Sequence, residues 1–300
     1  MNRVFVIGSI NVDILMLSDH LPEPGETIKA GSFYVYPGGK GANQAISSAR
    51  MGANTTLIGK IGNDYFGSLI KDFIGKENLN SIIMYGQKTG MAFINVDKNG
   101  KNMISVFSGA NNDLREEDLK DIKIDNSIIM LQQEIPMDTI EYVIKTYGRN
   151  NLIITDPSPI NEINDFVLSG SDYITPNEVE ASKLSGMHIN SREDAFKASE
   201  ILYKKYQTNI IIKLGSYGSL LNNGNEIRYF KPSTVNARDT TGAGDCFNGA
   251  FAAMLTKTSD VNKSMEIANM AAALSVTEYG AFPSFPYLND VKTKFNLNIN

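Results

Sequence analysis

Short apolar runs alternate with amphipathic segments through the second half of the chain, and this alternation constrains the fold most. The runs lie at 127–132, 152–156 and 209–214, and segments with helical spacing lie at 138–147, 177–185, 191–206, about 244–256 and 260–277. Strands that are buried on both faces read as continuous apolar runs, and intervening helices connect parallel neighbours. The pattern predicts an α/β fold, with a mostly parallel sheet and helices on both faces.

The first third of the chain instead alternates apolar and polar residues. A short apolar run at 3–8 is followed by alternation at 10–16 and 27–36, and the segments 90–97 and 101–107 flank Asn99-Gly100. Asn-Gly favours the positive backbone angles of a tight hairpin turn. We expect these strands to be antiparallel and partly exposed. Since there is no repeat or long linker, we expect one domain over 1–300 with a small antiparallel flap.

Composition excludes several classes of protein. The net charge is −5 with no basic cluster, so we expect no nucleic-acid partner. The single cysteine, Cys246, and only two histidines argue against a disulfide framework or a zinc site. The first apolar run is too short for a signal peptide, and no run approaches the roughly 20 residues that span a bilayer. We therefore expect a cytoplasmic enzyme of small molecules with no membrane contact.

One glycine-rich stretch, N-A-R-D-T-T-G-A-G-D, leads directly into an apolar helix. Gly242 and Gly244 would let the backbone approach a ligand, and the free amides of a first helical turn bind anions. Asp245 would repel such an anion unless it accepts a proton from an attacking hydroxyl. The alternative is that Asp245 only favours the helix N-terminus and the glycines only cap it.

Other candidate residues lie after predicted strands or at helix starts. Lys40 sits among glycines in P-G-G-K-G-A-N, which is neither a Walker A loop nor a dinucleotide motif and could be a plain turn. Asn11 and Asp13, at i and i+2, point to one side of an extended chain and suit a polyol, although solvated residues would look identical. Glu134 is equally ambiguous.

Two further segments complete the set of candidates. Asn177 and Glu180 are spaced as a capping box, which is the more economical interpretation of that spacing. The turn K-L-G-S-Y-G, at 213–218, follows the strongest apolar run. Ligands of α/β proteins bind at the carboxyl ends of parallel strands, where this turn is expected.

Taken in order, five motifs resemble those of the ribokinase-like carbohydrate kinases. They are S-I-N-V-D, G-G-K-G-A-N-Q-A, I-T-P-N-E-x-E, K-L-G-S-x-G and D-T-T-G-A-G-D-x-F-N-G-A, and they extend from Val4 to about Pro286. The first two motifs together are most similar to the ribokinase group. The resemblance implies a doubly wound domain with an antiparallel β lid, from strands at about 12–18, 27–37 and 89–108. The lid would also pair two subunits as a homodimer.

The same resemblance implies ATP-dependent phosphorylation of the 5-hydroxyl of D-ribose, which gives ribose 5-phosphate and ADP. Asp245 would take the proton from that hydroxyl. The amides of Gly242, Ala243 and Gly244 would form an anion hole. The residues that would bind the sugar are Asn11, Asp13, Gly39, Lys40, Gly41, Asn43, Glu134 and Asp245.

For the nucleotide and the cations, the resemblance implies three groups of residues. ATP would contact Asn177, Lys213, Leu214, Gly215, Ser216, Tyr217, Gly218, Gly244 and Asn269. Glu180 would organise Mg²⁺, or another divalent cation, through water. An activating K⁺ would be bound by Asp239, Thr241, Ser275, Glu278, Gly280 and Ser284. Glu278-Tyr279 departs from the family pattern, in which basic residues are frequent there, and this leaves the affinity for K⁺ open.

Two alternatives remain at this point. The chain could be a sister kinase acting on deoxyribose, fructose, a nucleoside or pseudouridine, because one sequence does not reveal the outer wall of the pocket. Ribose is favoured because Asn11, Asp13 and Asn43 offer several partners for hydroxyls. A catalytically silent sugar-binding sensor is the alternative from another class. It would be expected to lack the base or the anion hole, and this chain retains both motifs.

Overall fold

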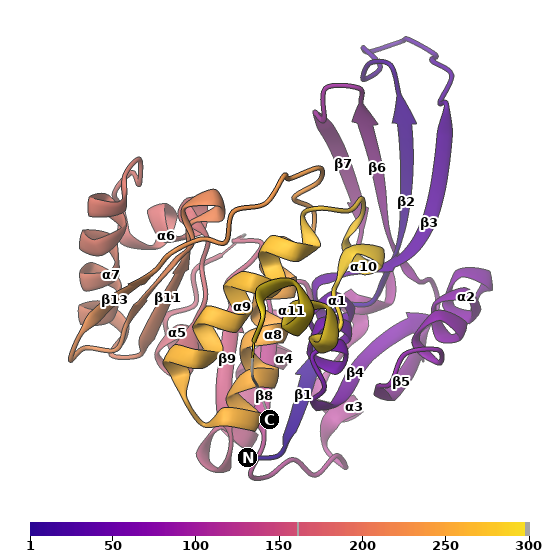
Figure 1. Cartoon of the computed structure of the whole chain (residues 1–300). Coiled ribbons are helices and arrows are strands. Elements are labelled where there is room, and N and C mark those ends of the chain that lie inside the picture. The colour runs from indigo at the N-terminus through magenta and orange to yellow at the C-terminus, as the bar shows by residue number, and fades with distance from the viewer. Residues whose placement is uncertain (161, 298–300) are drawn as a thin grey trace.

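A computed structural model describes residues 1–160 and 162–297 of the chain, which are built around a nine-stranded sheet (Figure 1). The strand order is β13-β12-β11-β10-β9-β8-β1-β4-β5. The bounds are β1 Arg3–Ile7, β4 Asn54–Gly62, β5 Asn80–Gly86, β8 Ile128–Gln132, β9 Leu152–Asp156, β10 Tyr173–Ile174, β11 Asn209–Lys213, β12 Ser219–Asn222 and β13 Ile227–Phe230. All pairs from β5 to β11 are parallel, and β12 and β13 add an antiparallel edge.

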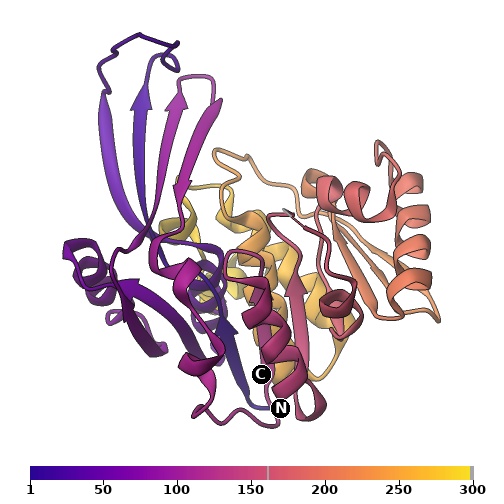
Figure 2. The same cartoon turned by 180° about the vertical axis from the view of Figure 1, so that it is seen from behind.

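Side-chain alternation along the strands divides the core into two faces. Val4 and Val6 of β1 belong to one apolar cluster, whereas Phe5 and Ile7 belong to another. The first face is covered by α1 Lys40–Arg50, α2 Tyr65–Ile74, α8 Ala243–Thr258, α9 Val261–Ser275 and α11 Leu288–Phe295. The opposite face is covered by α3 Glu116–Leu119, α4 Met137–Tyr147, α5 Asp165–Ser169, α6 Glu178–Ser185 and α7 Arg192–Tyr206 (Figure 2). The predicted mostly parallel sheet with helices on both faces is confirmed.

The chain winds outward from β1 in both directions. It first adds β4 and β5 on one side of β1, and then returns to add β8 and the later strands on the other side. The connections that follow β1 and β8 therefore diverge at the carboxyl ends of these strands, and such a switch point is where ligands of α/β proteins bind. The turn after β1 contains Ser9 and leads directly to Asn11, and the turn after β8 contains Glu134.

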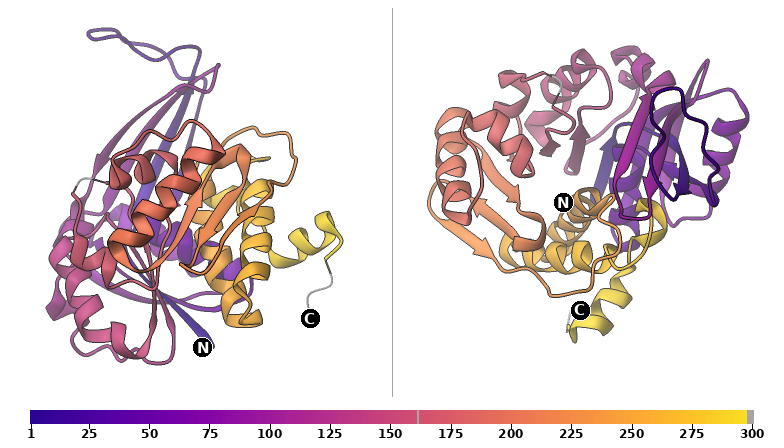
Figure 3. Two further views of the ribbon diagram at one scale, coloured as in Figure 1. Left: turned by 90° about the vertical axis from the view of Figure 1, so that its left-hand side faces the viewer. Right: turned by 90° about the horizontal axis from the view of Figure 1, so that it is seen from above.

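A second sheet of four strands, the lid, projects from the body at this same edge (Figure 1). Its order is β3-β2-β6-β7, with β2 Asn11–Ser18, β3 Ser32–Gly38, β6 Gly90–Asp97 and β7 Asn102–Phe107. The outer pairs are antiparallel, as predicted, but the central pair β2–β6 runs parallel. The lid and the β11–β13 edge lie at opposite ends of the molecule (Figure 3).

Local predictions around the lid were only partly accurate. The strand expected over 27–36 begins at Ser32, because the preceding residues form the loop at the lid tip. The hairpin at Asn99-Gly100 is present, but only Gly100 adopts a positive φ, of 80°. The elements β4, β5, α2, β12 and β13 were not predicted. Among the described residues, no helix is both long and apolar enough to cross a membrane.

Arg50, at the C-terminal end of α1, joins three segments of the first face. Its guanidinium forms a two-pronged ion pair with Glu77, at 2.7 and 3.0 Å, and both side chains are buried. It also donates to the carbonyls of Phe282 and Phe285, next to the short helix α10 Ala281–Ser284. The rings of Phe282 and Tyr287 pack against it at 4.8 and 5.0 Å. Arg50 therefore fixes the segment around α10 against α1.

Replacing Arg50 with Met should lower the free energy of unfolding by about 3–5 kcal/mol, because Glu77 would remain buried without a cation. Denaturant unfolding followed by circular dichroism measures this loss. The matched control is Arg3→Met, because the Arg3–Asp125 pair is long, at 3.4 Å, and exposed. Its loss should be under about 1 kcal/mol. Equal losses in the two variants would contradict the role assigned to Arg50.

Candidate active site

The N-terminus of α8 places Asp245 at the centre of the candidate site. Gly242, the N-cap, has φ 74°, and a Cβ there would lie 2.6 Å from that of Ala281, so only glycine fits. Asp245 lies in the first turn and is buried. Its Oδ2 accepts a hydrogen bond from Asn43 at 3.1 Å, and its Oδ1 accepts one from Gln44 at 3.0 Å. The carboxylate is therefore held in one orientation by side chains of α1.

The backbone amides at this helix start are partly free. Ala243 donates to the carbonyl of Thr240 at 3.2 Å, whereas the amides of Gly242, Gly244 and Asp245 have no acceptor among the described residues. Free amides and the helix dipole together attract an anion. Of the three amides expected to form an anion hole, those of Gly242 and Gly244 therefore have no acceptor among the described residues, whereas that of Ala243 is already bonded.

The start of α1 faces that of α8. Gly39 is its N-cap, with φ 84°, and the amide of Lys40 donates to Glu134 at 2.9 Å. Ser9 also donates to Glu134, and its hydroxyl accepts from the amide of Gly41. A Cβ at Gly41 would lie 2.5 Å from the backbone of Gly8, so this glycine serves close packing of α1 on β1.

The Lys40 ammonium is mostly buried and surrounded by carboxylates. Its Nζ lies 3.9 Å from Oδ1 of Asp245. Burial alone would lower the pKa of Lys40, but nearby carboxylates outweigh burial and raise this pKa. These carboxylates belong to Asp245, Asp156, Glu134 and Glu180. Lys40 therefore remains charged and offsets part of the negative charge of the site.

Asn11 and Asp13, at the base of the lid, face the same region. Asn11 is buried, and its Oδ1 accepts from Asn111 at 2.7 Å, which orients the Asn11 amide. Oδ1 of Asp13 is buried and has no partner among the described residues. Burial, reinforced by the charges of Glu134 and Asp245, raises the pKa of Asp13 to about 7. A buried, unsatisfied carboxylate is costly and suits a ligand that donates hydrogen bonds.

A buried polar network beneath Asp245 was not anticipated. Gln44 donates to Asp156 as well as to Asp245, each at 3.0 Å, and accepts from Gln132 at 2.7 Å. Asp156 also forms an ion pair with Lys213 at 3.2 Å. The position of Asp156 at the carboxyl end of β9 could have identified it, since Glu134 and Lys213 were chosen by the same rule. No local pattern marks Asn111.

Residues expected to bind a nucleotide lie farther along the same edge. Asn177 and Glu180 form the predicted capping box of α6, with hydrogen bonds of 2.8 and 2.9 Å. Gly215, Ser216 and Tyr217 form a 3-10 turn with Gly218 after it, and Leu214 is buried. A Cβ at Gly244 would lie 3.4 Å from Nζ of Lys213, so this ammonium stands beside the tip of α8. Asn269 is bonded to Ser219 at 3.0 Å.

Asp239 connects two loops near the helix start. Its Oδ1 accepts from the amide and hydroxyl of Thr241, and its Oδ2 accepts from the amide of Gly280 at 2.8 Å. Ser275 and Ser284 bond to carbonyls of their own helical segments. Glu278 is exposed, and its carboxylate lies 3.9 Å from the guanidinium of Arg238.

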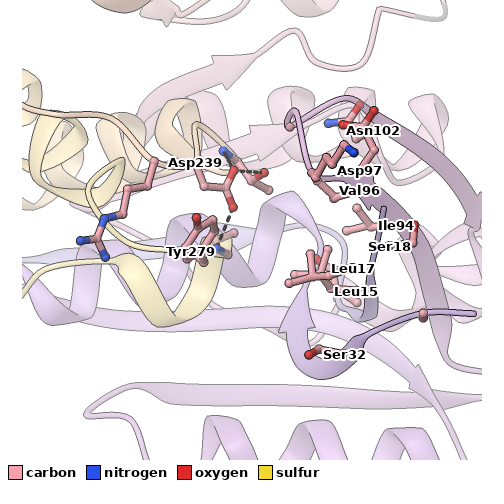
Figure 4. A pocket seen from close by; sticks show the side chains of 18 of the residues that line it. Leu15, Leu17, Ser18, Ser32, Ile94, Val96, Asp97, Asn102, Asp239 and Tyr279 are labelled. Atoms are coloured by element: carbon pink, nitrogen blue, oxygen red, sulfur yellow. Dashed lines mark hydrogen bonds between the residues drawn. The ribbon is translucent and has the colours of Figure 1, made fainter. Parts of the chain in front are cut away.

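A cleft of about 990 Å³ separates the lid from the loops that contain Asp239 and Tyr279 (Figure 4). The lid side is mixed, with the apolar residues Leu15, Leu17 and Ile94 beside polar ones such as Asp97 and Asn102. Asp13 belongs to this wall, whereas Asp245 lies deeper in the body. The cleft is therefore the entrance to the polar centre.

Comparisons with known proteins find relatives that match nearly the whole sequence and the whole fold of this chain. The chain is 34% identical over 288 residues to a ribokinase of Haemophilus influenzae, with 94% of each chain covered. The structure of a ribokinase from Thermotoga maritima superposes with a TM-score of 0.90 and 38% identity, covering 99% of this chain and 100% of that one. An Arabidopsis thaliana ribokinase complexed with ribose and ATP gives a TM-score of 0.86 at 31% identity, with 99% of both chains covered.

The match to a family model is equally extensive. The model of the pfkB family carbohydrate kinases aligns with residues 1–287, which include every residue of the candidate site. The family expected from the five motifs is thereby confirmed, and the chain belongs to the PfkB family of carbohydrate kinases.

Proposed function

We propose that this protein phosphorylates the 5-hydroxyl of D-ribose with ATP, giving ribose 5-phosphate and ADP. One observation carries the proposal: a buried carboxylate, Asp245, stands at the tip of α8 beside backbone amides that have no other acceptor. Ribokinases from three organisms, one of them complexed with ribose and ATP, support the choice of substrates. A cytoplasmic location is part of the proposal, because the single cysteine is buried and reduced.

In the proposed reaction, Asp245 accepts the proton of the sugar hydroxyl, and the hydroxyl oxygen attacks the γ-phosphorus of ATP. The new O–P bond forms as the bond to the departing ADP oxygen breaks. The amides of Gly242, Gly244 and Asp245 and the Lys213 ammonium stabilise the charge of the migrating group. Because such transition states are loose, positioning and electrostatics supply most of the rate.

The sugar is proposed to lie between the lid base and the two helix starts. Asn11, Asp13 and Asn43 offer acceptors, two of which, Oδ1 of Asp13 and Oδ1 of Asn43, are buried and unpartnered within the described part of the chain. Sugar hydroxyls would satisfy both. One oxygen of Glu134 accepts hydrogen bonds from both the Ser9 hydroxyl and the Lys40 amide, so we assign Glu134 mainly to orienting Lys40 and Gly39.

The donor sites for ATP and its cations are also proposals. We propose Mg²⁺ bound chiefly by phosphates and water; among the described residues, no three acidic, His or Cys side chains are grouped so that they could hold a metal ion by themselves. Glu180 uses one oxygen in its capping box, so the other can hold such a water. When bound, Mg²⁺ neutralises phosphate charge. An activating K⁺ is proposed near Asp239, whose bonds to Thr241 and Gly280 hold the two loops together.

The outer face of the lid is proposed to pair with a second copy of the chain. The strand registers place Phe33, Phe93, Met103 and Phe107 on the face opposite to Asp13, and all four are exposed. Exposed apolar groups gathered on one sheet face are typical of an interface. Pairing there would support the lid from outside while its inner face covers the sugar.

A coupled assay of ADP release tests the proposed activity directly. Ribose should stimulate ADP release more than deoxyribose, fructose or nucleosides, and K⁺ should increase the rate. If a nucleoside stimulates ADP release and ribose does not, the assignment of ribose as substrate is wrong, while the assignment of Asp245 as the base stands. A rate that does not change with K⁺ would contradict the proposed K⁺ site near Asp239.

Asp245→Asn should lower kcat by about 10²–10⁴-fold, which is the usual contribution of a positioned base. Ribose binding, measured by calorimetry, should change much less than kcat, because an amide of the same shape still accepts one of the two hydrogen bonds that Asn43 and Gln44 donate to Asp245. Turnover at the wild-type rate in this variant would rule out the assigned role.

Asp13→Asn should raise thermal stability at pH 8 and weaken ribose binding. The pKa of Asp13 is about 7 in the folded protein, against 3.8 for an unperturbed aspartate, so ionisation of Asp13 destabilises the folded state increasingly from about pH 4 to 7. The gain in Tm should therefore be full above pH 7 and vanish near pH 4. Asp19→Asn, at the exposed lid tip, is the control and should leave Tm nearly unchanged. A pH-independent gain would contradict this account.

A further inference from the structure

Gln44 lies at the junction between the base and a buried ion pair. Its Nε2 donates to Oδ1 of Asp245 and to Oδ2 of Asp156, each at 3.0 Å, and the three side chains are buried. A primary amide has two N–H donors, and here each is given to a different carboxylate. Asp156 also binds Lys213 at 3.2 Å, so one amide connects Asp245 to the lysine beside the α8 tip.

The orientation of the Gln44 amide is determined by a second glutamine. Gln132, the last residue of β8, donates from Nε2 to Oε1 of Gln44 at 2.7 Å. If the Gln44 amide turned over, its oxygen would face two carboxylates and its nitrogen would face another N–H group. Both contacts would be repulsive, so only one orientation is stable.

The Asp245 and Asp156 carboxylates therefore lie on either side of the Gln44 amide, and both accept hydrogen bonds from its Nε2. In a buried site, a hydrogen bond to a carboxylate is stronger than one between neutral groups, and losing it leaves a charge poorly solvated. The charged groups around Asp245 come from five elements or turns. They are Lys40 of α1, Asp156 of β9, Lys213 of β11, Asp13 of β2 and Glu134 after β8.

We propose that Gln44 is a positioning residue, which holds the Asp245 carboxylate aimed at the sugar and couples it to the Asp156–Lys213 pair. The role of Asp245 as the base rests on the proposed function. Gln44 itself touches neither substrate. It acts by presenting donors to the Asp245 and Asp156 carboxylates, while Asn43 binds the other Asp245 oxygen.

Gln44→Met, which keeps the length of the side chain and removes both donors, tests the proposal. Without the donors, the ionised base is less stable, so the acid limb of the kcat profile should move up by about one pH unit. At neutral pH, kcat should fall about 10-fold or more, while the KM for ATP changes less than about 3-fold. A purely structural role would lower Tm and leave the acid limb in place.

Gln133→Met is the matched control. Gln133 is the next residue to Gln132, is also buried, and has no acceptor or donor contact with either carboxylate. It should change neither kcat nor the acid limb. If Gln44→Met fails to fold, Gln132→Met can be used instead, because it removes the hydrogen bond that orients the Gln44 amide. It should shift the acid limb of the kcat profile in the same direction by a smaller amount. An unmoved limb in the folded variants would overturn the proposal.

A measurement without substrate separates this inference from the assignment of ribose. The carboxyl carbon of Asp245, assigned by comparison with Asp245→Asn, can be titrated by ¹³C NMR in the ligand-free protein. Its transition should occur at higher pH in Gln44→Met than in the wild type and Gln133→Met. If no sugar is phosphorylated, the proposed function fails while this comparison still decides the role of Gln44. Identical titrations in all three proteins would refute that role.

Discussion

The meeting of two helix starts over one carboxylate organises this molecule. Asp245 lies in the first turn of α8, where the dipole favours a negative charge, and α1 supplies Lys40, Asn43 and Gln44 around it. Larger residues would not fit at either helix start, because a Cβ at Gly41 would meet the backbone of Gly8 and a Cβ at Gly242 would meet Ala281. The glycine-rich motifs are therefore needed for packing as much as for ligand contact, which explains why sequence alone left both interpretations open.

Much of the fold follows from local patterns, and the exceptions have physical causes. Apolar runs such as 127–132 and 209–214 identified buried parallel strands, because side chains on both faces of such a strand are apolar. The edge strand β13 was missed because it has only four residues and its exposed position carries a charged residue that weakens the pattern. The parallel pairing of β2 with β6 joins segments far apart in sequence, and alternation within a strand does not determine the direction of its partner.

The candidate site shows the same division. Asp245, Lys40 and Glu134 were identified from motifs at helix starts and strand ends, and the structure brings them together. Asp156 and Gln44 were overlooked because a pattern marks the end of a strand without showing which neighbours its side chain meets. The bond of Ala243 to Thr240 depends on the exact path of a loop, and the contact of Asn111 with Asn11 spans 100 residues.

The partners of Asp245 have a consequence for how the molecule is assembled. Asn43 and Gln44 are 202 and 201 residues away from it along the chain. Contacts of such separation close large loops and cannot stabilise an intermediate in which only one half has folded. A molecule with native-like secondary structure but unjoined halves would contain every motif and still lack a working centre. Enzymatic competence in this architecture is thus a property of the completed tertiary structure, acquired when α1 and α8 dock against each other.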